Sequence, residues 1–485
     1  MNPPPPPPLS APPPQRFVVS TKNQPQVDER FNLLRRTGPL LYDSFINHNL
    51  YWGSLSVAWG ELTGYNDEFE TEQSIYYAGR SDGEFNSTKM HWRGSPGEFF
   101  AAKVLIPKPH TQSWQSLSFI KENRNTKKVT VYKRMIHPGE VNRIRSFPHA
   151  PHLIATLSDS PTTFVWDTKA QPNRLENQTD TSSASTLPSS AQKKKAITTT
   201  REFTEPCLAS VPDFRLEGHT SSADFALDTK GSRDVISAGA DRLVMLWDLE
   251  SAPERDGVLA PTCVFRGHVA PVEDCSFRPG SSGETSQLCS VGQDRELLLW
   301  DSRQGGQKPT SRTLGIHTDD ANCCAWNPFQ DWILTGGSDG VVNVFDCRQL
   351  GKGAVNQIQH KGSVINVRWS PHDANVFASS DESQFVSLFR LNSQKESGVE
   401  MLLQHGAHRS TVVDFQFNPI NPWVVVSVSD DSSEDTKCGG GTMQTWRVND
   451  LVHKDPGTDL EWANHMKKLL GQTTSTTSPD LDDEQ

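Results

Sequence analysis

Short apolar runs separated by turn residues recur along most of this chain. The stretch 267–303 opens on Gly267-His268, alternates apolar and polar positions, turns at Arg278-Pro279-Gly280, and returns in two further apolar runs that end on Trp300-Asp301. Alternation over such short runs indicates three β-strands, with a fourth implied by the spacing to the next copy.

The same pattern returns in five other parts of the chain. Each copy starts near a histidine and ends near a tryptophan or a phenylalanine, in the segments 137–167, 218–248, 317–346, 360–390 and 405–446. A Gly-His start and a Trp-Asp end at a period of roughly 40–45 residues are typical of β-propeller blades. One blade cannot bury both its faces, so the copies must stack radially and close.

The six marked copies, together with a less regular set of strands at 46–135, predict seven blades. The predicted fold class is all-β, a seven-bladed WD-repeat β-propeller over 46–455 with short N-terminal and C-terminal helices. We expect a strand from the C-terminus to complete the first blade, because closure of the ring removes free sheet edges.

The segments outside the blades differ from them in composition. Helical spacing of Val27, Phe31 and Leu34 predicts a helix within 26–45 that stops at Gly38-Pro39. The run Lys193-Lys194-Lys195 is either a nuclear-import signal or part of a solvated loop. The other predicted segments are a disordered Pro-rich lead at 1–25, a disordered insertion between the second and third blades at 168–212, a C-terminal helix at 456–471 and a disordered acidic tail at 472–485.

Charge and cysteine usage narrow the choice of partners. A net charge of −11 disfavours direct, sequence-specific nucleic-acid binding, which needs a basic face, and it favours basic partners instead. The eight cysteines are scattered without a CxxC pair, so no zinc site or disulfide framework is expected. No apolar run approaches the length of a membrane span. We expect a soluble intracellular protein with no cofactor.

Paired histidines and aspartates are the strongest candidates for chemistry. His219 with Asp241 and His268 with Asp294 could be general acid–base pairs beside Ser237 and Ser290. The same residue types recur from blade to blade, however, whereas an active site is built once. The pattern therefore favours a buried hydrogen-bonded network in each blade over a catalytic triad, and it disfavours an enzyme.

Several stretches together resemble the retinoblastoma-associated, histone-binding WD-repeat proteins. They include ERFNLLRRTGPLLYD at 29–43, HPGEVNRIR at 137–145, GHVAPVEDCSF at 267–277, HTDDANCCAWNPF at 317–329 and FNPINPWVVVSVSDD at 417–431. The Pro-rich start and the lysine-containing insertion are similar to the plant, FVE-like branch. The resemblance implies a nuclear scaffold that presents histones to deacetylase, Polycomb-type and chromatin-assembly complexes. In the plant branch it further implies transcriptional repression and control of flowering time.

The resemblance also implies a site for basic histone tails at the top of the propeller, where acidic and amide side chains start the first strand of each blade. The positions that match are Glu140, Asn142, Arg143, Asp224, Phe225, Glu273, Asp320 and Asn322. Ser363, Ile365 and Gln293 depart from the family pattern, and a lost acid should weaken the grip on Lys or Arg. Acids of the 430–441 insertion either restore that charge or belong to a solvated loop.

Two other surfaces follow from the resemblance. A histone helix would lie at the rim against Leu34, Leu41 and Leu403, but the loop 391–402 lacks the proline and the dense acid of the family, so the top face is favoured. Arg303 and Arg348, which follow WD-type pairs, resemble arginines that dock a cullin ligase adaptor. The alternative function is therefore a substrate receptor of a cullin-based ubiquitin ligase, unless these arginines are structural.

Overall fold

The computed structural model describes residues 24–50, 52–66, 70–81, 83–109, 128–175, 207–253, 257–280, 287–306, 308–392, 398–430 and 441–453. The predicted helix at 456–471 and tail at 472–485 lie outside these residues, as does the lead up to residue 23. The helices in the described part are α1 (Gln24–Leu41), α4 (Asp450–His453), η3 (Ser302–Gln304) and η4 (Leu350–Lys352). None of them is long and apolar enough to cross a membrane.

Seven antiparallel sheets form the blades, each starting from its innermost strand. Blade 1 contains β2 (Val57–Asn66), β3 (Glu70–Gly79), β6 (Glu98–Pro107) and β7 (Val129–Ile136). Blade 2 contains β8 (Val141–Phe147), β9 (Ala150–Ser158), β10 (Thr163–Asp167) and β12 (Phe214–Leu216). Blade 3 contains β13 (Ala226–Lys230), β14 (Asp234–Ala238), β15 (Leu243–Asp248) and β17 (Cys263–Arg266). Blade 4 contains β18 (Val272–Phe277), β19 (Gln287–Gly292), β20 (Leu297–Asp301) and β21 (Ser311–Thr313).

The remaining blades follow the same order. Blade 5 contains β22 (Ala321–Trp326), β23 (Trp332–Gly337), β24 (Val341–Asp346) and β25 (Asn356–Gln359). Blade 6 contains β26 (Val364–Trp369), β27 (Val376–Asp381), β28 (Val386–Leu391) and β29 (Val399–His405). Blade 7 contains β30 (Val412–Phe417), β31 (Val424–Ser429), β32 (Thr442–Val448) and, outermost, β1 (Tyr42–Asn49).

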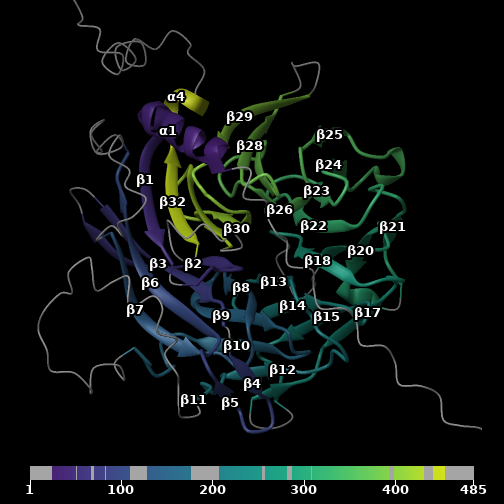
Figure 1. The fold of residues 1–485 in the computed structure, drawn as a ribbon. Helices are drawn as coiled ribbons and strands as arrows, with labels where there is room; N and C mark the ends of the chain where they lie inside the picture. The colour runs from purple at the N-terminus through teal and green to yellow at the C-terminus, as the bar shows by residue number, and fades with distance from the viewer. Residues whose placement is uncertain are drawn as a thin grey trace, which may run out of the picture.

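The innermost strands contact one another in sequence around a circle, and β30 contacts β2 again, so the ring is closed. Figure 1 shows the sheets arranged around this centre, with α1 and α4 together beside β1. Apolar side chains of neighbouring blades share clusters; Ile236 of blade 3, for example, packs with Phe277 of blade 4. The predicted all-β WD-repeat propeller is confirmed.

Ring closure differs from the prediction in its direction. The N-terminal strand β1 completes the last blade by pairing with β32, from Tyr42 opposite Val448 to Asn49 opposite Thr442. The first blade already has four strands within 57–136, so it takes none from the C-terminus. The Tyr42 hydroxyl and His405 Nδ1 share a 2.7 Å hydrogen bond, and Tyr42 is fully buried. Because blade 7 lacked an outer strand, the N-terminal segment was the one that could cover its edge.

The long insertion also lies elsewhere than predicted. Strand β12 is the fourth strand of blade 2, so the insertion separates β10 from β12 within that blade instead of joining two blades. Its ends are part of the fold: Gln171 is buried, and β11 (Cys207–Leu208) pairs with β5 (His91–Arg93). Together with β4 (Glu84–Asn86), these strands make a separate three-stranded sheet, and β16 (Val258–Leu259) pairs in parallel with β12. Residues 176–206, which include the lysine run, lie outside the described residues.

Helix α1 extends beyond its predicted stop. It continues through Gly38 and Pro39 to Leu41, and both stop residues are buried. Pro39 stands in the last turn, where it removes only one hydrogen bond of the helix, and tertiary packing outweighs that local preference. Phe31 and Leu34 pack on the blade 6 and blade 7 core with Phe45, which fixes α1 against the rim.

Candidate peptide-binding face

The predicted histone-tail residues meet at one end of the propeller. Glu140 directly precedes β8, Asp320 directly precedes β22, and Glu273 is the second residue of β18. All innermost strands of a propeller run in the same direction, so their first residues surround one opening. We call this end the top face.

Three carboxylates form an acidic cluster on blades 3 to 5 of the top face. Burial raises the pKa of Asp224, Glu273 and Asp320 above their ordinary values. The pKa of Glu273 is raised further by the charges of Asp320 and Asp224, although Gln293 donates a 2.8 Å hydrogen bond to it. Within the described residues, none of the three forms an ion pair. The cluster therefore carries negative charge that an external cation can neutralise.

Glu140 lies apart from this cluster and is already paired. Arg80 places Nε 3.2 Å from Glu140 Oε1 and Nη1 2.9 Å from Asp430 Oδ1. The arginine thus connects blade 1 to the start of blade 2 and the end of blade 7. Sequence reasoning missed Arg80, because its blade lacks the repeat signature and nothing in the sequence relates it to a residue 350 positions away. Of the acidic insertion at 430–441, residues 431–440 lie outside the described residues.

The two amides on this face differ in availability. Asn322 donates to Ser363 Oγ at 3.2 Å and to the Val364 carbonyl at 2.9 Å, and its Oδ1 accepts from Ser338. It therefore joins blade 5 to blade 6. Asn142 is half-buried, and among the described residues its side chain has no hydrogen-bond partner. Asn142 is thus the amide with free donor and acceptor groups for a peptide backbone.

Arg143 is part of the propeller's interior and not of its free surface. It is buried, its Nε donates to the Phe225 carbonyl at 2.8 Å, and Nη1 lies 3.5 Å from Asp414 Oδ1. Its guanidinium also lies 5.8 Å from the centroid of the Phe225 ring, which is 42% exposed. Arg143 therefore positions Phe225, and Phe225 is the group that a ligand can reach.

The recurring histidines form the predicted networks. His268 Nδ1 lies 2.8 Å from Asp294 and Nε2 2.7 Å from Ser290 Oγ, which also accepts from Trp300 Nε1 at 2.8 Å. His219 and His317 repeat the arrangement with Asp241 and Asp339. The imidazoles are buried and both ring nitrogens are bonded, so the prediction of a structural network in each blade is confirmed.

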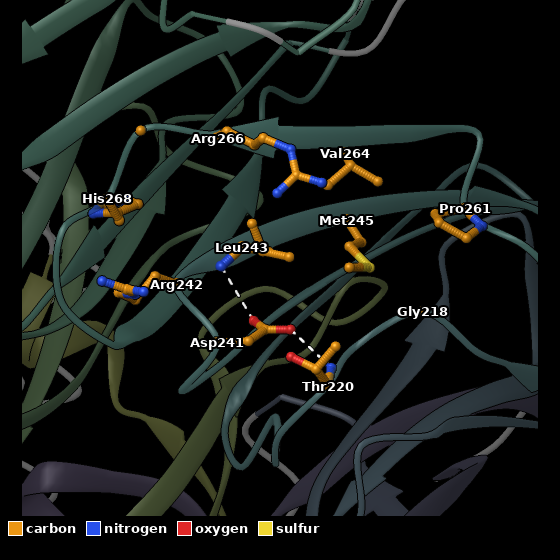
Figure 2. A pocket seen from close by; sticks show the side chains of 11 residues that line it. Gly218, Thr220, Asp241, Arg242, Leu243, Met245, Pro261, Val264, Arg266 and His268 are labelled. Atoms are coloured by element: carbon orange, nitrogen blue, oxygen red, sulfur yellow. Dashed lines mark hydrogen bonds between the residues drawn. The ribbon is translucent and has the colours of Figure 1, made fainter.

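Figure 2 shows a cavity of about 530 Å³ beside one of these networks, at the outer strands of blade 3. Asp241 accepts from the backbone N–H groups of Leu243 and Thr220, both at 3.1 Å, in addition to His219. The charged residues left at this cavity are Arg242 and Arg266. They are unsuited to a basic peptide, so we place the candidate site at the acidic cluster instead.

The rim residues occupy one apolar cluster, but the chain itself covers them. Leu34 and Leu403 are 6% and 5% exposed, and Leu41 is packed against the same cluster. Leu33, the neighbouring helix position, is 60% exposed. A ligand at the rim would therefore contact Leu33, whereas Leu34 holds α1 to the propeller.

Both arginines proposed for adaptor docking bind aspartates in their own turns. Arg303 Nε lies 2.9 Å from Asp301 Oδ1, and Arg348 donates to both oxygens of Asp346 at 3.0 and 2.9 Å. Both side chains remain 63% exposed, so the pairs are screened by solvent. This geometry agrees with the structural interpretation of the two residues.

The seven sheets and their repeated histidine networks define the protein as a WD-repeat β-propeller. Residues 308–346 match the family model of the WD domain, G-beta repeat, and residues 29–88 match that of histone-binding protein RBBP4 and its counterpart in the CAF1 complex. The chain is 32% identical over 471 residues to WD-40 repeat-containing protein MSI4 of Arabidopsis thaliana, and the alignment covers 90% of this chain and 84% of the relative. It therefore belongs to the RBBP4/CAF1C family of histone-binding WD-repeat proteins. The predicted family is confirmed.

Proposed function

We propose that the protein is a non-enzymatic histone-binding scaffold that takes up a basic histone tail on its top face. The acidic cluster of Asp224, Glu273 and Asp320 carries this proposal, because three partly buried carboxylates face one another without an internal cation. An incoming lysine or arginine would relieve their repulsion and form charge-assisted hydrogen bonds. Asn142 and the exposed edge of Phe225 supply polar and apolar contacts beside it.

Calorimetry with unmodified histone tail peptides tests this function. Charge reversal by Glu273→Lys should weaken binding by about 2–5 kcal/mol, the range for truncating a buried interfacial charge pair. Glu250→Lys is a matched control, because Glu250 follows β15 at the opposite end of blade 3 and its side chain is 67% exposed. Equal affinity of Glu273→Lys and wild type would remove the acidic cluster from the binding site.

We further propose a second contact at the rim, where a histone helix would lie along α1. The exposed Leu33 and the exposed Met401 of β29 support this contact, since α1 and β29 both border α4. Helix-in-groove binding depends on such apolar anchors. Part of the loop predicted to border the groove, 393–397, lies outside the described residues.

The setting in which this scaffold works follows from the family. We propose that it is a nuclear component of deacetylase or Polycomb-type complexes, that it acts in transcriptional repression, and that it contributes to control of flowering time as the plant branch does. Family membership and the plant relative support this proposal. Purification of the tagged protein from nuclei, followed by mass spectrometry, tests it. Recovery with a cullin adaptor and without chromatin proteins would favour the alternative function, for which the internally paired Arg303 and Arg348 give no support.

A further inference from the structure

A second cavity of about 670 Å³ lies on the top face outside Glu140. Its walls come from the β4–β5 hairpin, from the turn between β9 and β10, and from the end of β12. The hairpin lies in the connection between β3 and β6 of blade 1, so the cavity is formed between that connection and blade 2.

The hairpin wall is held firmly to the propeller. Trp92 is buried, its ring centroid lies 5.1 Å from that of Phe85, and its Nε1 donates to the His137 carbonyl at 2.8 Å. Strand β11 adds to the hairpin by pairing with β5, and the Ala209 N–H donates to the Met90 carbonyl at 3.0 Å. The cavity is therefore largely formed before any ligand arrives, which limits the entropy lost on binding.

The lining combines acid with apolar surface. Four carboxylates line it against one guanidinium, that of Arg215; they belong to Glu84, Glu140, Asp159 and Glu217. Glu84, Asp159 and Glu217 are exposed, whereas Phe85 and Met90 are half-buried. Among the described residues, no group of three or more His, Cys, Asp or Glu side chains is arranged to hold a metal ion. The charge therefore suits an organic cation with an apolar stem.

The cavity is electrostatically continuous with the acidic cluster. Asp159 lines the cavity, and its charge raises the pKa of Asp224 in addition to the larger effect of burial. Glu140 lines the same cavity and stands at the start of the innermost strand β8. An extended peptide crossing the top face would thus meet acid both at the centre and at the hairpin.

We propose that this hairpin cavity binds a second lysine or arginine side chain of the tail whose first cation lies at the acidic cluster. The inference rests on the proposed function, and it adds a separate recognition point. The aliphatic stem of the side chain packs on Phe85 and Met90, and its charged end faces Asp159 and Glu217. Phe85 adds a cation–π contact. The cavity therefore sets the spacing between two basic residues of the tail.

The test compares wild type with the double variant Asp159→Asn/Glu217→Gln by fluorescence anisotropy on a histone tail peptide that wild type binds. The double variant should weaken binding about tenfold at low salt, as the loss of two partly exposed ion pairs implies. Glu250→Gln serves as the control and should bind as wild type does. Phe85→Ala keeps every charge and should also weaken binding. Unchanged affinity in both the double variant and Phe85→Ala would overturn the proposal.

A norleucine scan of the peptide locates the side chain involved. One norleucine replacement should weaken binding to wild type and have no further effect on the double variant. If wild type binds no histone tail, the proposed function fails, and the cavity is then tested alone by saturation-transfer NMR with Nα-acetyl-arginine amide. A signal that the double variant loses, and that Nα-acetyl-norleucine amide does not give, supports the cavity. A signal of equal strength in wild type and double variant overturns it.

Discussion

Arg145 and Asp414 lie 3.0 Å apart across the joint at which the ring closes. Arg145 belongs to β8 of blade 2 and Asp414 to β30 of blade 7, and the innermost strand of blade 1 passes between them. Ser56, directly before β2, donates to the same carboxylate oxygen at 2.6 Å, and the Val57 N–H donates to it at 3.2 Å. One carboxylate therefore connects three blades, including the first and the last.

Replacing Asp414 should destabilise the whole ring. Burial opposes ionisation of Asp414, but Arg145, Arg143 and Arg368 together lower its pKa to about 2. Asp414→Asn would leave these buried cations uncompensated, at a cost of about 3–5 kcal/mol in the free energy of unfolding. Urea unfolding at pH 7 measures this cost, with Glu250→Gln as a surface control. A loss below about 1 kcal/mol would show that the carboxylate does not hold the joint.

The pH dependence of this pair has a defined sign. The folded-state pKa of Asp414 is lowered, so its contribution is complete above its ordinary pKa of 3.8 and is lost as the pH falls through about 2. Wild type should therefore lose this part of its stability only in strong acid. The Asp414→Asn variant should lack that acid-dependent component.

Buried histidines should make the propeller sensitive to milder acid. Burial lowers the pKa of His137 and of His405 from 6.5 to about 3. Their stabilising effect is complete above pH 6.5 and falls as the pH drops below it, because the unfolded chain then binds protons that the folded chain excludes. At pH 5 each should reduce the free energy of unfolding by ~2 kcal/mol relative to pH 7. Urea unfolding at both pH values measures the loss, and His137→Gln should show a smaller one.

Glu273→Gln should separate binding from stability. The pKa of Glu273 is raised by burial and by the neighbouring acids, so its charge weakens the folded state at neutral pH. The neutral variant should melt at the same temperature as wild type or higher. Its affinity for a histone tail should fall by about tenfold or more, since one charge partner is lost. A fall in both melting temperature and affinity would instead mean that Glu273 is needed for folding.

The affinity itself should depend on pH. The tail binds the ionised carboxylates, and the raised pKa values of Asp224, Glu273 and Asp320 bring their protonation to a higher pH than usual. Affinity should therefore decrease as the pH falls toward those values, and the decrease should be smaller in Glu273→Gln. Calorimetry at pH 7.5 and pH 5.5, roughly one unit above the ordinary carboxylate range at its lower end, gives the comparison.

Adjacent leucines of α1 should respond in opposite ways. Leu34→Asp puts a charge into the shared core and should lower the free energy of unfolding by about 3 kcal/mol or more. Leu33→Asp, at an exposed position, should change it by no more than about 0.5 kcal/mol. If a histone helix binds at the rim, Leu33→Asp should abolish that binding while the protein stays folded. Binding that survives Leu33→Asp would place the helix elsewhere.

The blades and their networks were determined by sequence alone, because the interactions that define them are local. His268, Ser290 and Trp300 lie in one copy of the repeat, so their spacing already shows that one sheet brings them together. The same spacing recurs in other blades, which separated structural networks from catalysis. The family followed from motifs of the same local kind and was confirmed.

The tertiary structure alone decided the features that join distant parts of the chain. Tyr42 bonds His405, Arg80 bonds Asp430 350 positions away, and Arg145 bonds Asp414 269 positions away. No local pattern specifies which partner such a residue meets, since any blade edge accepts a strand and any buried cation needs an acid. For the same reason, motif matching placed Arg143 and Leu34 among the binding residues. Only packing revealed that the propeller uses both of them for its own stability, and that Phe225 and Leu33 are the neighbours open to a ligand.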